Sequence, residues 1–189
     1  MKKAECKSMS AAECNGFSMA TALKALKKSD PELIPLLDAF NIPDLEVKTN
    51  YFQALVRSII YQQLSGKAAQ TIAQRFKALF DGTDLPGPHD VVIKDHQTLR
   101  SAGLSNSKAS YIHNIAHAFL NGTIDHKNLG SMSNSEIVDQ LTSVKGVGPW
   151  TAQMFLMFTL NRPDIFPTTD LGIQKGYQKF YKLSDLPKS

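Results

Sequence analysis

The sequence predicts an all-α fold. Apolar residues recur at helical spacing in most of the chain, no stretch alternates convincingly as a strand, and cap residues or Gly and Pro separate the periodic segments. With 189 residues and 42% hydrophobic content, the chain suffices for one compact domain or two small lobes that share a core. No apolar run is long enough for a membrane span or a signal peptide, so we expect an intracellular location: cytoplasm or nucleoid in a bacterium, nucleus in a eukaryote.

The N-terminal quarter is predicted to be weakly structured at first. Residues 1–18 are polar and unpatterned, so we expect a flexible leader and a fold that starts near Met19. Ser29 and Glu32 have the spacing of a capping box that opens a short helix through Leu37.

Two helices joined by a tight turn are expected next. Asn50 is the predicted N-cap of the first helix and Ser65 that of the second, with residues 62–65 as the turn between them. Apolar residues at helical spacing support both helices: Phe52, Leu55, Val56, Ile59 and Ile60, then Ala69, Ile72, Ala73 and Phe76. The Gly- and Pro-rich residues 81–90 predict a loop, and residues 107–120 predict a helix that Asn121 and Gly122 end.

A further helix pair surrounds a glycine-rich turn. Ser133 and Glu136 form a capping box for a helix that we expect to end at Lys145, and Pro149 suits the first turn of the following helix. Between them, Gly146-Val147-Gly148 lets the backbone turn tightly and leaves N–H groups free at a helix N-terminus, where a phosphate oxygen binds well. The motif predicts an anion-binding hairpin, although a plain Gly-rich turn between helices fits the same pattern.

Charge favours a polyanionic partner. The net charge is +4, and no acidic residue lies between Glu46 and Asp81. Five basic residues fall inside that stretch: Lys48, Arg57, Lys67, Arg75 and Lys77. They predict a positive face, or an ordinary solvated helix face. Cys6 and Cys14 show no metal-ligand or disulfide pattern, so neither an iron–sulfur cluster nor redox chemistry is expected.

Four segments in this order resemble the helix-hairpin-helix (HhH-GPD) DNA glycosylase superfamily, in the branch of 3-methyladenine DNA glycosylase II. They are SIIYQQLSGKAAQTIAQRF at 58–76, LRSAGLSNSKASYIHNIAHAF at 99–119, LTSVKGVGPWTAQMF at 141–155 and FPTTDLGIQKG at 166–176. The resemblance implies two helical lobes around a cleft. We expect residues 19–49 with 164–189 to form the smaller lobe, and residues 50–163 a helical bundle with the helix-hairpin-helix at 134–160.

Asp170 matches the essential aspartate of that family. Thr168 is the predicted cap of the last helix, which would place Asp170 in the first turn, where the helix dipole favours an ionised carboxylate. Such an anion would stabilise the positive charge that builds on deoxyribose when an N-glycosidic bond breaks. From the residues alone, a structural role is favoured for Asp170, because it is the commonest role of an aspartate at a helix N-terminus.

Trp150 occupies the position where lyase-type members carry the lysine that forms a Schiff base. Tryptophan cannot do this chemistry, so the resemblance implies a monofunctional glycosylase that uses water. An indole beside the cleft would also attract a cationic base such as 3-methyladenine, by about 0.5–2 kcal/mol of cation–π interaction. The alternative is a buried packing residue between the lobes.

The resemblance assigns DNA contacts as well. Gln63 and Leu64 correspond to the probe that fills the gap left by a flipped nucleotide, although Leu64 also fits as a core residue under a turn. Tyr61, one position earlier, is a candidate for the base pocket.

At the hairpin, Lys145, Gly146 and Gly148 are expected to contact DNA phosphate. The family binds a structural Na⁺ or K⁺ there through main-chain carbonyls, which fall here on Thr142, Val144 and Val147. No cofactor is expected for catalysis.

Two departures from the family pattern are visible. Thr169 stands where many relatives have an acidic residue, and the sequence ends at Ser189 where relatives continue with an aromatic-rich segment, so one wall of the pocket is expected to be open or built differently. We therefore expect a monomeric enzyme of base excision repair that removes alkylated purines, 3-methyladenine and 7-methylguanine, from double-stranded DNA and leaves an abasic site. A binder of damaged or abasic DNA that excises nothing is the alternative; a lyase for oxidised bases is disfavoured by Trp150 and by the absence of a four-cysteine cluster.

Overall fold

The computed structural model describes residues 18–45, 48–80 and 86–188, and these residues form helices and no strand. This confirms the predicted all-α class. Most of the predicted leader lies outside the described residues; Ser18, at its end, instead caps the first helix, α1 (Met19–Ser29), by accepting the Thr21 N–H. Among the described residues, no helix has the length and apolar content needed to cross a membrane.

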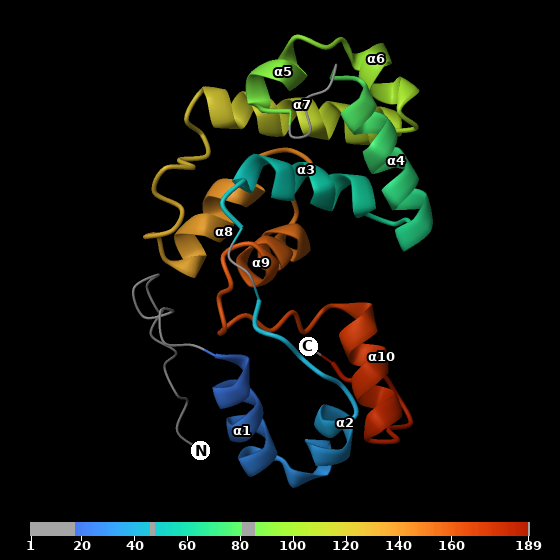
Figure 1. Ribbon diagram of the computed structural model, residues 1–189, viewed down its shortest axis with the longest axis vertical. Helices are drawn as coiled ribbons and strands as arrows, with labels where there is room; N and C mark the ends of the chain where they lie inside the picture. Colours follow the sequence, from blue (N-terminus) through green and yellow to red (C-terminus); the bar gives the residue numbers. More distant parts are fainter. Residues whose placement is uncertain (1–17, 46–47, 81–85, 189) are drawn as a thin grey trace.

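The main bundle runs from α3 to α9 (Figure 1). Helix α3 (Tyr51–Tyr61) packs on α4 (Gly66–Ala78), α7 (Asn106–Leu120) and α9 (Pro149–Phe158), and α9 also packs on α8 (Asn134–Thr142). The predicted apolar stripes supply the fully buried side chains, among them Leu55, Ile59, Ile112, Ile115, Leu141 and Leu156. The core of the bundle therefore surrounds α3, and the packing of α4, α7 and α9 on this helix fixes its position.

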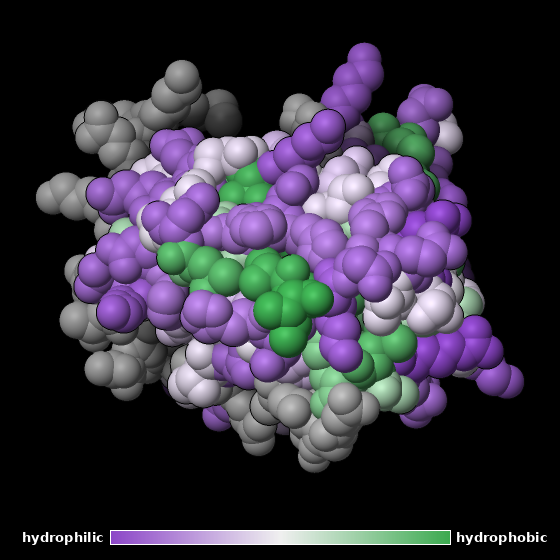
Figure 2. All heavy atoms as spheres, turned by 90° about the horizontal axis from the view of Figure 1, so that it is seen from above, coloured by the Kyte–Doolittle hydropathy of each residue, from purple (hydrophilic) through white to green (hydrophobic). Residues whose placement is uncertain are grey.

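Two short helices inside the bundle were not expected. Helix α5 (Pro88–Val92) begins within the predicted loop 81–90, of which residues 81–85 lie outside the described part, and α6 (His96–Ser101) follows it. Both pack on α7. The surface above these helices is mostly hydrophilic with small apolar areas (Figure 2).

The predicted helix starts have mixed outcomes. Asn50 caps α3 by accepting the Gln53 N–H at 3.1 Å, and Ser133 with Glu136 forms the expected capping box. Ser65 stands at the N-cap of α4, but its side chain makes no capping hydrogen bond.

The capping box predicted at Ser29 is wrong. Ser29 is the last residue of α1, and Asp30 caps the next turn, η2 (Pro31–Leu33), by accepting the Glu32 N–H. Aspartate is as good an N-cap as serine, and Pro31 suits the first helical position. The N-cap is therefore Asp30, one residue after the predicted Ser29. Helix α8 also ends earlier than expected, at Thr142 instead of Lys145.

The helices nearest the chain ends lie together in the lower part of Figure 1: α1, α2 (Ile34–Asp38) and α10 (Leu171–Phe180). None of these three helices contains a buried residue. They join the bundle through the crossing segments, where the Lys48 N–H donates to the Thr159 carbonyl at 3.2 Å and Asn161 Nδ2 donates to the Leu45 carbonyl at 2.7 Å. The division into two lobes at the predicted boundaries stays a proposal.

Candidate functional site

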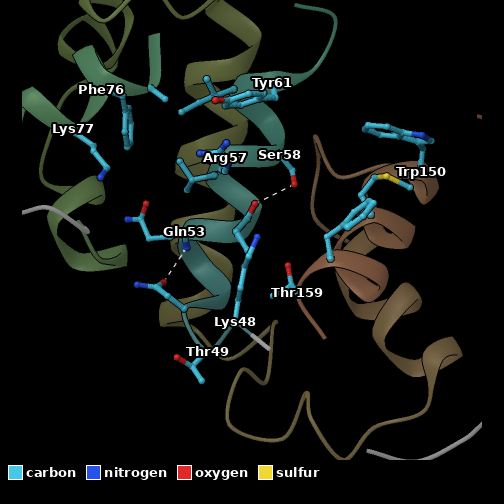
Figure 3. A pocket seen from close by; sticks show the side chains of 17 residues that line it. Lys48, Thr49, Gln53, Arg57, Ser58, Tyr61, Phe76, Lys77, Trp150 and Thr159 are labelled. Carbon is cyan, nitrogen blue, oxygen red and sulfur yellow. Dashed lines mark hydrogen bonds between the residues drawn. The ribbon is translucent and has the colours of Figure 1, made fainter. Parts of the chain in front are cut away.

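A pocket of about 710 Å³ opens between α3 and α4 on one side and α9 on the other (Figure 3). Its lining combines aromatic and basic side chains: Tyr61, Trp150 and Phe158 with Lys48, Arg57 and Lys77. In Figure 3, Trp150 lies across the opening from Tyr61 and Arg57 of α3. The pocket suits a planar ligand attached to a polyanion, because aromatic and positively charged side chains line the same pocket.

Asp170 lies beside this pocket through its contact with Trp150. The indole Nε1 of Trp150 donates to Asp170 Oδ2 at 2.8 Å, and the backbone N–H of Ile173 donates to Asp170 Oδ1 at 2.9 Å. Asp170 is itself the N-cap of α10, so the expectation that Thr168 caps this helix is wrong. The chain turns through Thr168 and Thr169 before it becomes extended at Asp170, which leaves the aspartate as the first side chain able to reach the helix N–H groups.

These hydrogen bonds keep Asp170 ionised. The Ile173 backbone N–H and, after it, the Trp150 indole N–H lower the pKa of the Asp170 carboxyl below its ordinary value. Each carboxylate oxygen accepts one of these bonds, and an ionised carboxylate can accept more than two hydrogen bonds in all. The site therefore holds a fixed negative charge that can accept further hydrogen bonds from a ligand or water.

The two predicted pocket residues, Trp150 and Tyr61, are partly accessible. Trp150 is 41% exposed, which contradicts the alternative of a buried packing residue. Tyr61 is half-buried, and the Arg57 guanidinium carbon lies 4.5 Å from its ring centroid. Arg57 and Tyr61 lie four positions apart in α3, a spacing that brings two side chains together on one face of a helix.

The turn after α3 presents the two predicted probe residues to solvent. Gln63 adopts a left-handed backbone with φ of 56°, and Leu64 is 40% exposed. Leu64 is therefore not a core residue. The turn projects an amide and an apolar side chain outward from the end of α3.

Three residues that were not singled out in the sequence hold this turn in place. Lys108 of α7 donates from Nζ to the carbonyls of Ile60 at 2.8 Å and Gln62 at 2.6 Å. Gln62 Nε2 lies 3.1 Å from the Thr151 Oγ1 of α9. These hydrogen bonds join residues that are far apart in the sequence, so no local sequence pattern predicts them.

The hairpin between α8 and α9 has the tight turn that its glycines predict. Gly146 has φ of +111°, and a β-carbon there would lie 2.2 Å from Cγ of Tyr111, so both the conformation and the space require glycine. Gly148 is the N-cap of α9, and a β-carbon there would meet no atom within 4 Å. The N-terminus of α9 and the exposed Lys145 thus face open space, as an anion site requires.

The three hairpin carbonyls expected to bind a cation lie where a helix end leaves carbonyl groups available. Thr142 is the last residue of α8, and the Val144 carbonyl accepts the Val147 N–H at 3.0 Å, which closes the turn. Main-chain carbonyl oxygens are suitable ligands for hard cations. The residues fit a monovalent ion by their chemistry.

The comparison with known proteins agrees with this geometry. A model of the HhH-GPD superfamily, described as a base excision DNA repair protein, matches residues 56–189. DNA-3-methyladenine glycosylase 1 of Schizosaccharomyces pombe is 33% identical, over 87% of this chain and 73% of that protein. DNA-3-methyladenine glycosylase of Saccharomyces cerevisiae is 34% identical, over 91% of this chain and 62% of that protein.

A solved structure shares the fold. The S. pombe 3-methyladenine DNA glycosylase in complex with abasic DNA superimposes with a TM-score of 0.79 at 32% identity, covering 89% of this chain and 84% of that one. The segments that carry the pocket, the hairpin and Asp170 all fall within the residues that the family model matches, apart from the start of α3 and the residues before it. The chain therefore belongs to the HhH-GPD superfamily of base excision DNA repair proteins.

Proposed function

We propose that this protein is a monofunctional DNA glycosylase that hydrolyses the N-glycosidic bond of alkylated purines in duplex DNA. Its substrates are 3-methyladenine and 7-methylguanine, and its product is an abasic site. The observation that carries the proposal is the Asp170 carboxylate, held by the Trp150 indole N–H and the Ile173 backbone N–H at the edge of an aromatic pocket. The relatives named for 3-methyladenine glycosylase activity support the substrate class.

Asp170 acts mainly as a fixed anion in this proposal. When the bond between C1′ and the purine nitrogen breaks, its electron pair goes to the base and positive charge develops on the sugar. A carboxylate with a lowered pKa is a weak base, so its larger contribution is to stabilise that charge and to orient the water that adds to C1′. The water's proton leaves through Asp170 to solvent. No cofactor enters the reaction.

Trp150 and Tyr61 form the proposed base-binding pair. A purine alkylated at N3 or N7 is cationic, and aromatic faces attract it by about 0.5–2 kcal/mol. Such a base is already an activated leaving group and needs little protonation. With tryptophan in place of a Schiff-base lysine, the enzyme has no nucleophile for strand cleavage at that position.

The turn and the hairpin are the proposed DNA contacts. Gln63 and Leu64 would enter the minor groove and replace the flipped nucleotide in the stack, because both project from α3 into solvent. The N-terminus of α9 at Gly146 and Gly148, with Lys145, would bind a backbone phosphate. A Na⁺ or K⁺ ion on the carbonyls of Thr142, Val144 and Val147 would bridge the hairpin to that phosphate.

Incubation of the full chain with methylated duplex DNA tests the proposal. We expect free 3-methyladenine and 7-methylguanine to be released under single-turnover conditions, with strand breaks only after alkali treatment. A parallel reaction with borohydride should trap no covalent complex. Unmethylated duplex of the same sequence is the control.

Two results would contradict the proposal in different ways. Tight binding to methylated or abasic duplex without base release would indicate a non-excising binder of damaged DNA. A borohydride-trapped complex with strand breaks before alkali would indicate a lyase.

A further inference from the structure

One helix, α7, contacts both of the segments that we propose to touch DNA. Its residues Lys108, Tyr111 and Asn114 recur at intervals of three and so lie along one side of the helix. Lys108 reaches the end of α3 beside the probe turn, while Tyr111 and Asn114 reach the hairpin. The probe turn and the hairpin are thus attached to a common support.

The Lys108 contact is well suited to hold the probe turn. Its ammonium group donates to two carbonyls at the C-terminus of α3, those of Ile60 and Gln62, immediately before Gln63. These carbonyls belong to the helix end that attracts positive charge and lacks intrahelical donors. Lys108 is half-buried, and its two hydrogen bonds to these carbonyls use two of the three donors of its ammonium group.

A second contact joins the same turn to the hairpin helix. Gln62 Nε2 lies 3.1 Å from Oγ1 of Thr151, which is 2% exposed and follows Trp150 in α9. A displacement of the turn would therefore break a buried hydrogen bond next to the proposed base pocket.

At the other end of the support, α7 closes on the hairpin. Asn114 Nδ2 donates to the Lys145 carbonyl at 3.0 Å, and the Tyr111 ring lies where a side chain of residue 146 would be. Side chains of α7 thus set the hairpin backbone at the position where we propose that phosphate binds.

We propose that Lys108 is a positioning residue that fixes the probe turn relative to the hairpin, so that duplex DNA held at the hairpin meets Leu64 at a set distance. This inference rests on the proposed function for the roles of the turn and the hairpin. Lys108 touches neither base nor sugar in this account; it acts through the backbone of the turn. Loss of its ammonium group should impair recognition of a gap in the base stack more than the general affinity for duplex.

The first test compares Lys108→Met with Lys127→Met. Both variants remove one positive charge, and Lys127 is an exposed residue between α7 and α8. The measurement is affinity for duplex with an abasic site and for undamaged duplex of the same sequence. We expect the ratio of abasic-duplex affinity to undamaged-duplex affinity to be about tenfold lower in Lys108→Met than in Lys127→Met. The affinity for undamaged duplex should be the same in the two variants. Equal preference in the two variants would overturn the proposal.

A double-mutant cycle with Leu64→Ala separates positioning from a general structural effect. If Lys108 acts through the probe, Lys108→Met should cost no further abasic-site preference once Leu64 is alanine. Additive losses would contradict the proposal. Lys108→Gln, which removes the charge and shortens the side chain, is the second variant for the cycle if Lys108→Met melts far below the wild type, and the same lack of additivity is expected.

The preference for abasic over undamaged duplex also distinguishes a failure of this inference from a failure of the proposed function. Abasic-site preference depends on no base release, so the cycle can succeed with a protein that excises nothing. Conversely, base release by the wild type with additive losses in both cycles would leave the glycosylase proposal intact and overturn the role of Lys108.

Discussion

Asp170 combines an N-cap role with the chemical role that we propose for its carboxylate. Its Oδ1 caps α10 through the Ile173 N–H, while its Oδ2 accepts the Trp150 indole N–H. The cap fixes the carboxylate relative to the helix, and the indole fixes it relative to the pocket. A carboxylate on a flexible loop would lose orientational freedom each time it reached its working position. The two hydrogen bonds hold the Asp170 carboxylate in one orientation before a ligand binds.

Trp150→Phe should move the acid limb of the pH–rate profile. Removal of the indole donor takes away one interaction that favours the ionised carboxyl, so the pKa of Asp170 rises towards its ordinary value and the rate falls at a higher pH than in the wild type. The measurement is the single-turnover rate of methylated-base release between pH 3 and 7, on the order of the range where carboxylates titrate.

Ile173→Val is the matched control for that profile. It keeps the backbone N–H that bonds to Asp170, so its acid limb should coincide with that of the wild type. An unchanged acid limb in Trp150→Phe would show that the indole does not tune the carboxylate.

The match to a family motif identified Asp170 as a candidate catalytic residue, but the hydrogen-bond partners of its carboxylate could not be predicted. Thr168, Thr169 and Asp170 are all good cap residues, and only the path of the backbone decides among them. The bond to Trp150 joins residues on two different helices, which no local pattern records. Sequence identified the charge, and the structure supplied its orientation.

At the scale of elements, the hairpin depends on its two glycines for different reasons. Gly146 is required by its left-handed backbone and by the Tyr111 ring. Gly148 has an ordinary φ of −92° and open space beside it. The sequence motif does not distinguish the two glycines. In the structure, the conformation and the packing require glycine only at residue 146, and we propose that Gly148 gives a phosphate access to the helix N-terminus.

Gly148→Ala should weaken DNA binding without unfolding the hairpin. The added methyl group points into the space proposed for phosphate, and we expect about a tenfold loss of affinity, equivalent to about 1.4 kcal/mol, for damaged and undamaged duplex alike. The cost to stability should be small, about 0.5 kcal/mol for a changed N-cap. Fluorescence anisotropy with both duplexes and a thermal melt measure the two effects.

Gly146→Ala provides the contrast. Its clash with Tyr111 and its strained backbone should lower the free energy of unfolding by about 2 kcal/mol or more. If Gly148→Ala retained wild-type affinity for both duplexes, phosphate binding at the N-terminus of α9 would be excluded.

The longer helices were the easiest elements to predict. Helices α3, α7 and α9 carry apolar stripes several turns long, and caps or breakers mark their ends. Helices α5 and α6 are too short for periodicity to show, and α5 begins at a Pro that also fits a loop. The early end of α8 arises because its last turn gives way to the hairpin, where Val144 stays buried without being helical.

At the scale of the whole molecule, the two ends of the described chain contact each other. The Tyr181 hydroxyl, at the end of α10, donates to the carboxylate of Asp30, which caps η2. This hydrogen bond, with the Asp30 charge beside it, raises the pKa of Tyr181 to about 12. It ties the helix that begins at Asp170 to the N-terminal helices and thereby helps to place the carboxylate.

Tyr181→Phe should reduce thermal stability in a pH-dependent way. A folded-state pKa raised above the unfolded value of about 10 contributes stability that is complete below pH 10 and is lost as pH rises towards 12. The difference in melting temperature between wild type and Tyr181→Phe should therefore shrink over that interval. Tyr177→Phe, which keeps the ring contact with Tyr181 and the hydrogen bond from Tyr181 to Asp30, should melt with the wild type at neutral pH. A constant difference for Tyr181→Phe across the interval would argue against the Asp30 contact.

Features that are formed by several segments of the chain together could not be predicted from the sequence. The pocket is formed by α3, α4 and α9 together, and the support of the probe turn by Lys108 crosses from α7 to α3. Three basic residues of the stretch between Glu46 and Asp81, namely Lys48, Arg57 and Lys77, line this pocket. Their convergence with Trp150 required the fold.

The central claim is that the Asp170 carboxylate drives base release, and Asp170→Asn tests it most directly. Asparagine is also a good N-cap, so α10 should persist, and affinity for abasic duplex should remain within about threefold of the wild type. The single-turnover rate of 3-methyladenine release from methylated duplex should fall by about 10²- to 10³-fold, as expected for loss of a preorganised charge. Release at the wild-type rate by a folded, DNA-binding Asp170→Asn protein would contradict the account.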